Sequence, residues 1–235
     1  MDITPCTTGI LRPLPGLVSV LHLGGDAATE HLHPLERELL SGMPASRHPD
    51  FVRGRRAAAH ALALLGRAGA VVRDGSAPLF PAGVRGSISH CRGIAGAGAA
   101  TVRRDVVGVG VDVERVGRLS RRTASLVCTP GERKRLDSGD PAVLATVFSM
   151  KEAVYKALSR LEPTRSPLVF HGVEVRLENG QTEIDDVAGL LLPDERLQGC
   201  FRRLGNYVWT TAWVSNRMPD HGSELGTSTE QHMLG

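Results

Sequence analysis

Hydrophobic and polar residues alternate along this chain in patterns that predict several regular elements. Residues 47–66 predict a helix, because apolar side chains recur there at helical spacing and Gly66 offers a stop. The strongest helical signal covers residues 140–161, where Asp140 can cap the N-terminus and Pro141 takes the first helical position. Its apolar stripe comprises Val143, Val147, Met150, Val154, Ala157 and Leu161.

Extended segments are predicted between and after these helices. Residues 86–102 have an extended pattern, and residues 106–114 are a β-branched run suited to a buried strand. Alternate side chains of a strand point to the same face, so Asp112 and Glu114 would share one face. Residues 169–177 and 207–214 also have the pattern of strands.

Composition narrows the class of protein. Of 235 residues, 41% are hydrophobic and 23% charged, which excludes wholesale disorder, and no apolar run approaches the ~20 residues that a membrane-spanning helix needs. Residues 1–5 form no basic segment leading into an apolar one, so nothing suggests secretion. The four cysteines lie far apart, which fits neither a disulfide framework nor a zinc ribbon, and we expect a cytoplasmic protein.

Lysine and arginine are used very unequally. The net charge is only +3, but the chain contains three lysines, Lys134, Lys151 and Lys156, and every other strong base is arginine. Two of the three lysines fall within six residues on the predicted helix 140–161. This suggests a need there for a movable ammonium group that can donate a proton.

Three carboxylates are candidates for a metal site. Asp112 and Glu114 end the predicted strand, and Glu152 lies on the long helix. Oxygen ligands at a strand–helix junction suit Mg²⁺, which completes its shell with water and phosphate oxygens. The alternative is a pair of solvated carboxylates, with Glu152 and Lys156 forming a surface ion pair that contributes ~0.2–0.5 kcal/mol.

Two further segments are candidates for binding anions. Residues 86–91, GSISHC, could offer backbone and side-chain donors, although a lone histidine near a strand is more often packed in a core. Arginines cluster at positions 47, 53, 55 and 56. Such a cluster is usually a solvated helix face or a nucleic-acid footprint, but bidentate binding of a phosphomonoester fits equally well.

Taken together, these segments resemble the 4′-phosphopantetheinyl transferases, specifically the larger single-chain type of the enterobactin-type and mycobacterial-type subgroup. Residues 108–114, GVGVDVE, look like the family segment G-[IV]-D-x-E. Residues 148–158, FSMKEAVYKAL, look like its more specific F-[SA]-x-K-E-A-x-Y-K-A segment, and residues 86–91 are similar to G-S-[IL]-[ST]-H-C. The resemblance covers roughly residues 47–214.

The resemblance implies an α/β (α+β) fold of two similar halves about a pseudo-twofold axis, with coenzyme A in the cleft between them. Residues 1–104 would form the N-terminal half, residues 105–215 the C-terminal half, and residues 216–235 a flexible tail. The implied reaction transfers the 4′-phosphopantetheine arm of coenzyme A to a serine of an apo acyl or peptidyl carrier protein, and releases adenosine 3′,5′-bisphosphate.

Matched positions imply roles in the C-terminal half. Asp112, Glu114 and Glu152 would hold Mg²⁺, with Mn²⁺ as a substitute, against the pyrophosphate. Glu152 would take the serine proton as general base, directly or through a metal-bound water. Lys156 would stabilise the departing phosphate, and Lys151 would contact the pyrophosphate or support that site.

The N-terminal half would bind the nucleotide end of coenzyme A. Arg47 and Arg55 match the arginines that hold the 3′-phosphate in the subgroup, and Ser89 and His90 match the adjacent phosphate contacts. Where the subgroup usually has a lysine before its aromatic-Pro pair, this chain has Gly75 and Ser76, with Arg73 as the nearest base.

The expected partner is a small acidic helical carrier protein rather than nucleic acid or a membrane, and a monomer would suffice. One rival is a metal-dependent nuclease, although such sites carry Glu-x-Lys along a strand, whereas here Lys151 precedes Glu152 in a helical pattern. The other is a non-catalytic module that binds nucleic acid through its arginine helix and leaves the carboxylates unused.

Overall fold

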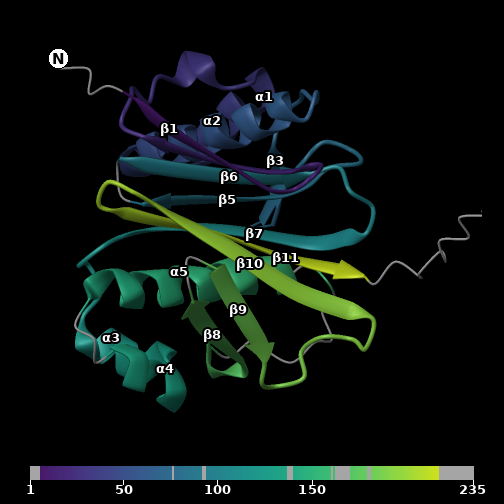
Figure 1. The fold of residues 1–235 in the computed structure, drawn as a ribbon. Coiled ribbons are helices and arrows are strands. Elements are labelled where there is room, and N and C mark those ends of the chain that lie inside the picture. Colours follow the sequence, from purple (N-terminus) through teal and green to yellow (C-terminus); the bar gives the residue numbers. More distant parts are fainter. Residues whose placement is uncertain are drawn as a thin grey trace, which may run out of the picture.

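The described residues fold into two large antiparallel sheets, with helices on their outer sides, and one small two-stranded sheet. The computed structural model describes residues 6–75, 77–91, 94–136, 140–159, 161, 170–178 and 181–216. Within them the order of layers is helix, sheet, sheet, helix, which is an α+β arrangement (Figure 1). The predicted tail lies outside the described residues beyond position 216, and no helix among the described residues has both the length and the apolarity to cross a bilayer.

A four-stranded sheet, in the order β1-β2-β6-β5, forms the first half. Its strands are β1 (Thr7–Leu14), β2 (Leu17–Leu23), β5 (Arg85–Cys91) and β6 (Ala95–Thr101). Between β2 and β5 the chain forms α1 (Pro34–Glu38), α2 (His48–Leu64) and a small hairpin of β3 (Val72–Asp74) and β4 (Ala77–Leu79). Helix α2 packs on this sheet through an apolar cluster that includes Ala58, Leu62 and Val20.

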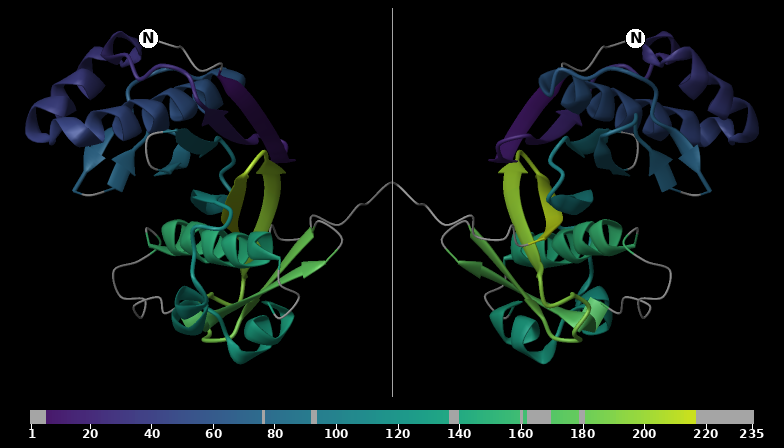
Figure 2. Two further views of the ribbon diagram at one scale, coloured as in Figure 1. Left: turned by 90° about the vertical axis from the view of Figure 1, so that its left-hand side faces the viewer. Right: turned by 90° about the vertical axis from the view of Figure 1, so that its right-hand side faces the viewer.

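A five-stranded sheet, in the order β7-β11-β10-β9-β8, forms the second half. Its strands are β7 (Val106–Arg115), β8 (Val173–Glu178), β9 (Gln181–Asp186), β10 (Glu195–Leu204) and β11 (Tyr207–Asn216). Its helices are α3 (Arg121–Val127), α4 (Pro130–Leu136) and α5 (Pro141–Leu158). Helix α5 packs against this sheet, as the views in Figure 2 show.

The two halves repeat one connectivity. In each, a strand leads to a long helix and then to a hairpin whose last strand returns to pair with the first: β2–α2–β5–β6 and β7–α5–β10–β11. This repetition bears out the expectation of two similar halves. The sequence predicts α2, α5, β7 and β11, and the extended segment 86–102 is the β5–β6 hairpin. The strand predicted over residues 169–177 corresponds to β8, which begins at Val173, while residue 169 lies outside the described residues. The first hairpin, β1–β2, was missed, as were α3 and α4.

The inner faces of the two sheets bury a shared core. Apolar side chains from β2, β6, β7 and β11 form one cluster, in which Trp209 is fully buried. The Trp209 indole donates a hydrogen bond to the Ser19 hydroxyl oxygen at 2.9 Å, and the Thr211 hydroxyl donates to the same oxygen at 2.7 Å. The polar groups of this core are thus paired across the seam between the halves.

Glycines let each long helix lie directly on a strand. A Cβ atom at Gly108 or Gly110 of β7 would overlap carbonyl oxygens of α5, and one at Gly98 of β6 would overlap the backbone of α2. Only residues without side chains permit backbones to approach this closely. Because Gly110 lies two residues before Asp112, the same contact holds the end of β7 against the polar side of α5.

Candidate functional site

Asp112, near the end of β7, is the centre of a polar cluster that joins the two halves. Its side chain is buried, and its Oδ1 accepts hydrogen bonds from Lys156 Nζ and from Ser89 Oγ, each at 2.8 Å. Lys156 Nζ also donates to Ser89 Oγ at 3.1 Å and to the Val111 carbonyl at 3.0 Å. Strand β5 of one half therefore meets β7 and α5 of the other at this carboxylate.

Glu114 and Glu152 lie close enough to Asp112 to be affected by its charge. Burial, followed by the Asp112 carboxylate, raises the pKa of Glu114, and the same two causes raise the pKa of Glu152. Arg118 opposes this rise in the pKa of Glu114, and its Nη1 lies 3.6 Å from Glu114 Oε2. Across the described part of the chain, Glu152 makes no hydrogen bond or ion pair.

Two carboxylate oxygens of this cluster are buried without a donor. Asp112 Oδ2 and Glu114 Oε2 accept no hydrogen bond from the described residues. At Glu114, the Arg118 guanidinium is near enough for an ion pair but too distant for a hydrogen bond. Such unmet acceptors cost free energy in a protein interior. Oxygen atoms in this state fit a hard cation such as Mg²⁺.

The three predicted carboxylates do not, however, form a ready-made cage. Over the ranges that the structure describes, no three His, Cys, Asp or Glu side chains form a group that could hold a metal ion. The Lys156 ammonium contacts Oδ1 of Asp112, and, besides burial, the negative charges of Asp112 and Glu152 help to raise the pKa of Glu114. Mg²⁺ commonly binds through one or two carboxylates plus substrate phosphates, so these residues suit an ion that arrives with its ligand.

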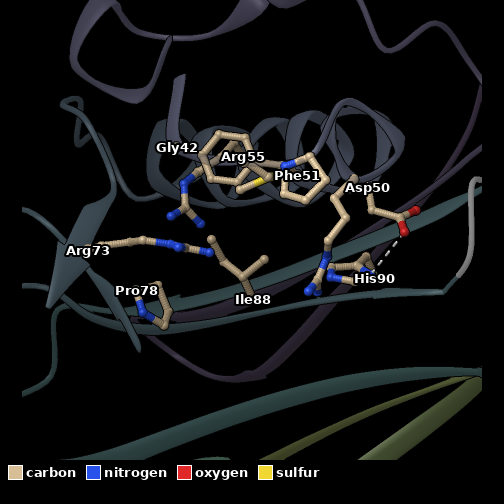
Figure 3. A pocket seen from close by; sticks show the side chains of 11 residues that line it. Gly42, Asp50, Phe51, Arg55, Arg73, Pro78, Ile88 and His90 are labelled. Atoms are coloured by element: carbon tan, nitrogen blue, oxygen red, sulfur yellow. Dashed lines mark ion pairs between the residues drawn. The ribbon is translucent and has the colours of Figure 1, made fainter. Parts of the chain in front are cut away.

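A positively charged pocket of about 350 Å³ lies beside this cluster, bounded by α2, the β3–β4 hairpin and β5. Its charged lining consists of Arg47, Asp50, Arg55, Arg73 and His90, shown in part in Figure 3. Phe51, Pro78 and Ile88 contribute apolar wall. Cationic groups beside flat apolar surface suit a ligand that combines a phosphate with an aromatic ring.

Arg55 is the most constrained cation of this pocket. It is 5% exposed, its guanidinium carbon lies 4.6 Å from the centre of the Phe51 ring, and its Nη2 donates to the Val72 carbonyl at 3.4 Å. Burial lowers the pKa of Arg55 to about 10; nearby Arg73 adds to the shift and Glu36 opposes it. The group is therefore still protonated near neutral pH. Arg47 lines the same pocket, so the structure brings the two predicted arginines together.

His90 connects the pocket to the carboxylate cluster. Its Nδ1 is 3.6 Å from Asp50 Oδ2 (Figure 3). Burial lowers the pKa of His90, and the positive charges of Lys156 and Arg47 lower it further. The negative charge of Asp50 acts in the opposite direction. A smaller pocket of about 210 Å³ is lined by Lys156 and shares Pro78 with the first. Ser89 does not line the arginine pocket, so its contact with coenzyme A stays a prediction.

Of the two roles predicted for Lys151, contact with the pyrophosphate or support of that site, only the supporting role agrees with its position in the structure. Lys151 is fully buried, where its Nζ pairs with Glu132 Oε2 at 2.8 Å and donates to three backbone carbonyls, those of Val127, Phe170 and Val173. Every proton of the ammonium is engaged, and none is available to a ligand. This lysine holds α5 to α3, α4 and the start of β8.

Some of the residues around the site were missed by reasoning from sequence. Glu132 belongs to no recognisable motif. Helical geometry does, however, indicate that its partner Lys151 could be buried. At 100° per residue, Lys151 lies roughly 80° from Val143 in the apolar stripe, whereas Glu152 lies roughly opposite it. Lys151 was therefore on the border of the buried face. Arg118 had no sequence signal, since its place beside Glu114 depends on the turn after β7.

Comparisons with known proteins agree with these observations. A model described as the 4′-phosphopantetheinyl transferase N-terminal domain matches residues 35–100, and one described as the 4′-phosphopantetheinyl transferase superfamily matches residues 108–212. The chain is 36% identical over 129 residues to 4′-phosphopantetheinyl transferase Npt of Nocardia iowensis, covering 53% of this chain and 58% of that protein.

Two further curated relatives are similar over longer stretches. Enterobactin synthase component D of Salmonella typhi is 36% identical over 160 residues, covering 63% of this chain and 65% of that protein. For 4′-phosphopantetheinyl transferase PptT of Mycobacterium tuberculosis the identity is 34% over 155 residues, covering 63% and 66%. The match thus spans somewhat less than two thirds of each of these relatives.

Solved structures give a weaker likeness. Holo-[acyl-carrier-protein] synthase of Thermotoga maritima aligns with a TM-score of 0.40 and 21% identity, covering 49% of this chain and 67% of that one. A structure of the ACPS-CoA complex of Chronobacterium ammoniagenes aligns with a TM-score of 0.39 and 20% identity, covering 47% and 98%.

Proposed function

Because the chain belongs to the 4′-phosphopantetheinyl transferase superfamily, we propose that it transfers the 4′-phosphopantetheine arm of coenzyme A to a serine of an apo acyl or peptidyl carrier protein. The observation that carries this proposal is the adjacency of two sites. An arginine-lined pocket suited to a nucleotide phosphate lies next to a carboxylate–lysine cluster suited to a reacting diphosphate. His90 is close to both.

Coenzyme A would lie with its 3′-phosphate among Arg47, Arg55 and His90 and its pyrophosphate toward Lys156. Guanidinium groups bind phosphate oxygens in a bidentate manner, which fixes the ligand as well as attracting it. The Phe51 ring and Ile88 would contact the adenosine part. The cysteines are all free, which supports a reducing, cytoplasmic setting for the protein.

Asp112, Glu114 and Glu152 would hold Mg²⁺, which fits the unmet oxygens of Asp112 and Glu114. When bound, the ion would neutralise charge on the diphosphate and make its phosphorus more electrophilic. Lys156 contacts Asp112 in the free protein, and its flexible stem would let the ammonium turn to the leaving phosphate.

Transfer then needs one proton to move. The carrier serine oxygen forms a bond to the phosphorus that carries the pantetheine arm, and the bond from that phosphorus to adenosine 3′,5′-bisphosphate breaks. Glu152 would accept the serine proton, because it is the carboxylate of the cluster with no ion pair among the described residues. Lys156 would stabilise the negative charge that develops on the departing phosphate.

The direct experiment is to incubate the protein with Mg²⁺, coenzyme A and several apo carrier proteins and to weigh the carriers by mass spectrometry. We expect a gain of one phosphopantetheine on serine, lost on adding a chelator and severely reduced in Glu152→Gln. A folded protein that modifies none of the carriers would contradict the proposal. Metal-independent binding of DNA or RNA that weakens steeply with salt would instead favour a nucleic-acid module.

A further inference from the structure

The arginine pocket holds more positive charge than its acidic neighbours balance. Arg47, Arg55 and Arg73 all line it. The one carboxylate in its lining, Asp50, lies 3.6 Å from His90, and Glu36 lies 4.0 Å from Arg55. Around Arg73 the described residues place no carboxylate within ion-pair distance.

Arg73 enters the pocket from a different element than the other two arginines. Arg55 lies on α2 and Arg47 immediately precedes it, whereas Arg73 is on β3 of the small hairpin. Figure 3 shows its side chain extending from that strand across the pocket toward Ile88, below Arg55. It is exposed and, within the part of the chain that the structure describes, makes no hydrogen bond or ion pair.

Two guanidinium groups that share a pocket without an intervening carboxylate repel each other. At Arg55 burial is the main cause of the lowered pKa, and the positive charge of Arg73 acts in the same direction. An anion placed between them would convert the repulsion into two attractions, and a phosphomonoester with up to two negative charges would do so best. A ligand without that group would leave the repulsion in place.

We propose that Arg73, reaching across from the β3–β4 hairpin, completes a three-arginine site for a phosphomonoester and so selects nucleotides that carry a 3′-phosphate. This inference rests on the proposed function, in which that group belongs to coenzyme A. It assigns Arg73 as a binding residue for substrate. The hairpin, whose Pro78 lines both pockets, becomes the second wall of the nucleotide site.

Calorimetric titration of the full-length protein tests this proposal. The probes are adenosine 3′,5′-bisphosphate and adenosine 5′-monophosphate, which differ by the 3′-phosphate alone. We expect Arg73→Ala to weaken the bisphosphate about 10- to 100-fold while changing the monophosphate little, as for loss of one charged hydrogen-bonding group. Arg73→Lys should retain part of the preference, since it keeps the charge but not the bidentate geometry.

The matched control is Arg67→Ala, which removes an exposed arginine outside the pocket and should change neither affinity. Equal effects of Arg73→Ala on both nucleotides, or none on either, would overturn the proposal. The outcomes separate it from the transferase proposal. Arg73-dependent binding of the bisphosphate without modification of any carrier would sink the latter alone, whereas carrier modification with unchanged nucleotide preference in Arg73→Ala would sink the former alone.

Discussion

Helix α5 carries two lysines five residues apart, and each forms an ion pair with a carboxylate. One pair is buried in the interior, and the other lies beside the pockets. Lys151 and Glu132 are both fully enclosed, and their charged atoms are all hydrogen-bonded. Lys156 is 27% exposed, and its partner Asp112 keeps one buried oxygen without a donor. An ion pair whose hydrogen-bonding atoms are all engaged can only stabilise the fold. A pair beside a pocket with an unmet carboxylate oxygen can still bind a ligand or a metal ion.

The largest effect should come from breaking the enclosed pair. Lys151→Met leaves the Glu132 carboxylate buried and uncompensated, which should lower the free energy of unfolding by about 3–5 kcal/mol. Urea denaturation followed by circular dichroism measures this. The double variant Lys151→Met/Glu132→Gln removes both charges and should be less destabilised than the sum of the single changes. Additive losses would show that the two side chains are not coupled.

For the partly exposed pair of Lys156 and Asp112, we expect a large loss of activity and a small loss of stability. Lys156→Ala removes the group proposed to meet the leaving phosphate and should reduce kcat/KM for carrier modification about 100-fold or more, as for loss of a positioned charge. Its free energy of unfolding should fall by only about 1–2 kcal/mol, because the Lys156 side chain is partly exposed to water, unlike that of Lys151. A variant that loses stability like Lys151→Met but keeps its activity would reverse our assignment of the two lysines.

A smaller effect on stability is expected at His22, a half-buried histidine whose pKa is lowered by burial and by nearby positive charge. His22 Nε2 is 3.0 Å from His60 Nδ1, and burial, with the charges of His60 and Arg56, lowers the pKa of His22 from 6.5 to about 4. The unfolded chain therefore binds more protons between these values. The free energy of unfolding should fall by about 1–3 kcal/mol as pH drops from 6.5 to 4.

Urea titrations across this pH range measure the slope. His22→Gln, which cannot titrate, should flatten it, while His171→Gln, at an exposed histidine, should leave it unchanged. An unaltered slope in His22→Gln would assign the pH dependence to other groups.

Much of the fold and part of the site followed from local chemistry. Helix α5 was predictable because its N-cap is local: Asp140 accepts a hydrogen bond from the Ala142 amide at 2.8 Å. Strand β7 was predictable from its β-branched run, and Asp112 and Glu114 from their place at its end. By contrast, β1 lies at a sheet edge and has no buried residue, so its sequence lacks the apolar alternation that marks a strand.

The features of the site that sequence reasoning missed come from contacts distant in sequence. Lys151 shares its motif with Glu152, but its burial depends on Glu132 in α4 and on carbonyls at Phe170 and Val173. The pairing of Asp112 with Lys156 and Ser89 likewise joins three elements. Spacing within a motif orders residues along one element and says nothing of which outside partners saturate them.

The glycines where β7 meets α5 have a further consequence for how this protein can change over time. At Gly108 and Gly110 the separation of strand and helix is set by main-chain atoms in contact, with no side chain as spacer. Substitutions in the surrounding core can therefore alter the size of side chains without shifting the carboxylates of β7 relative to Lys156. The arrangement of the reacting groups is therefore little affected by substitutions elsewhere in the interior. It is sensitive at Gly108 and Gly110, where even one added methyl group would overlap the helix backbone.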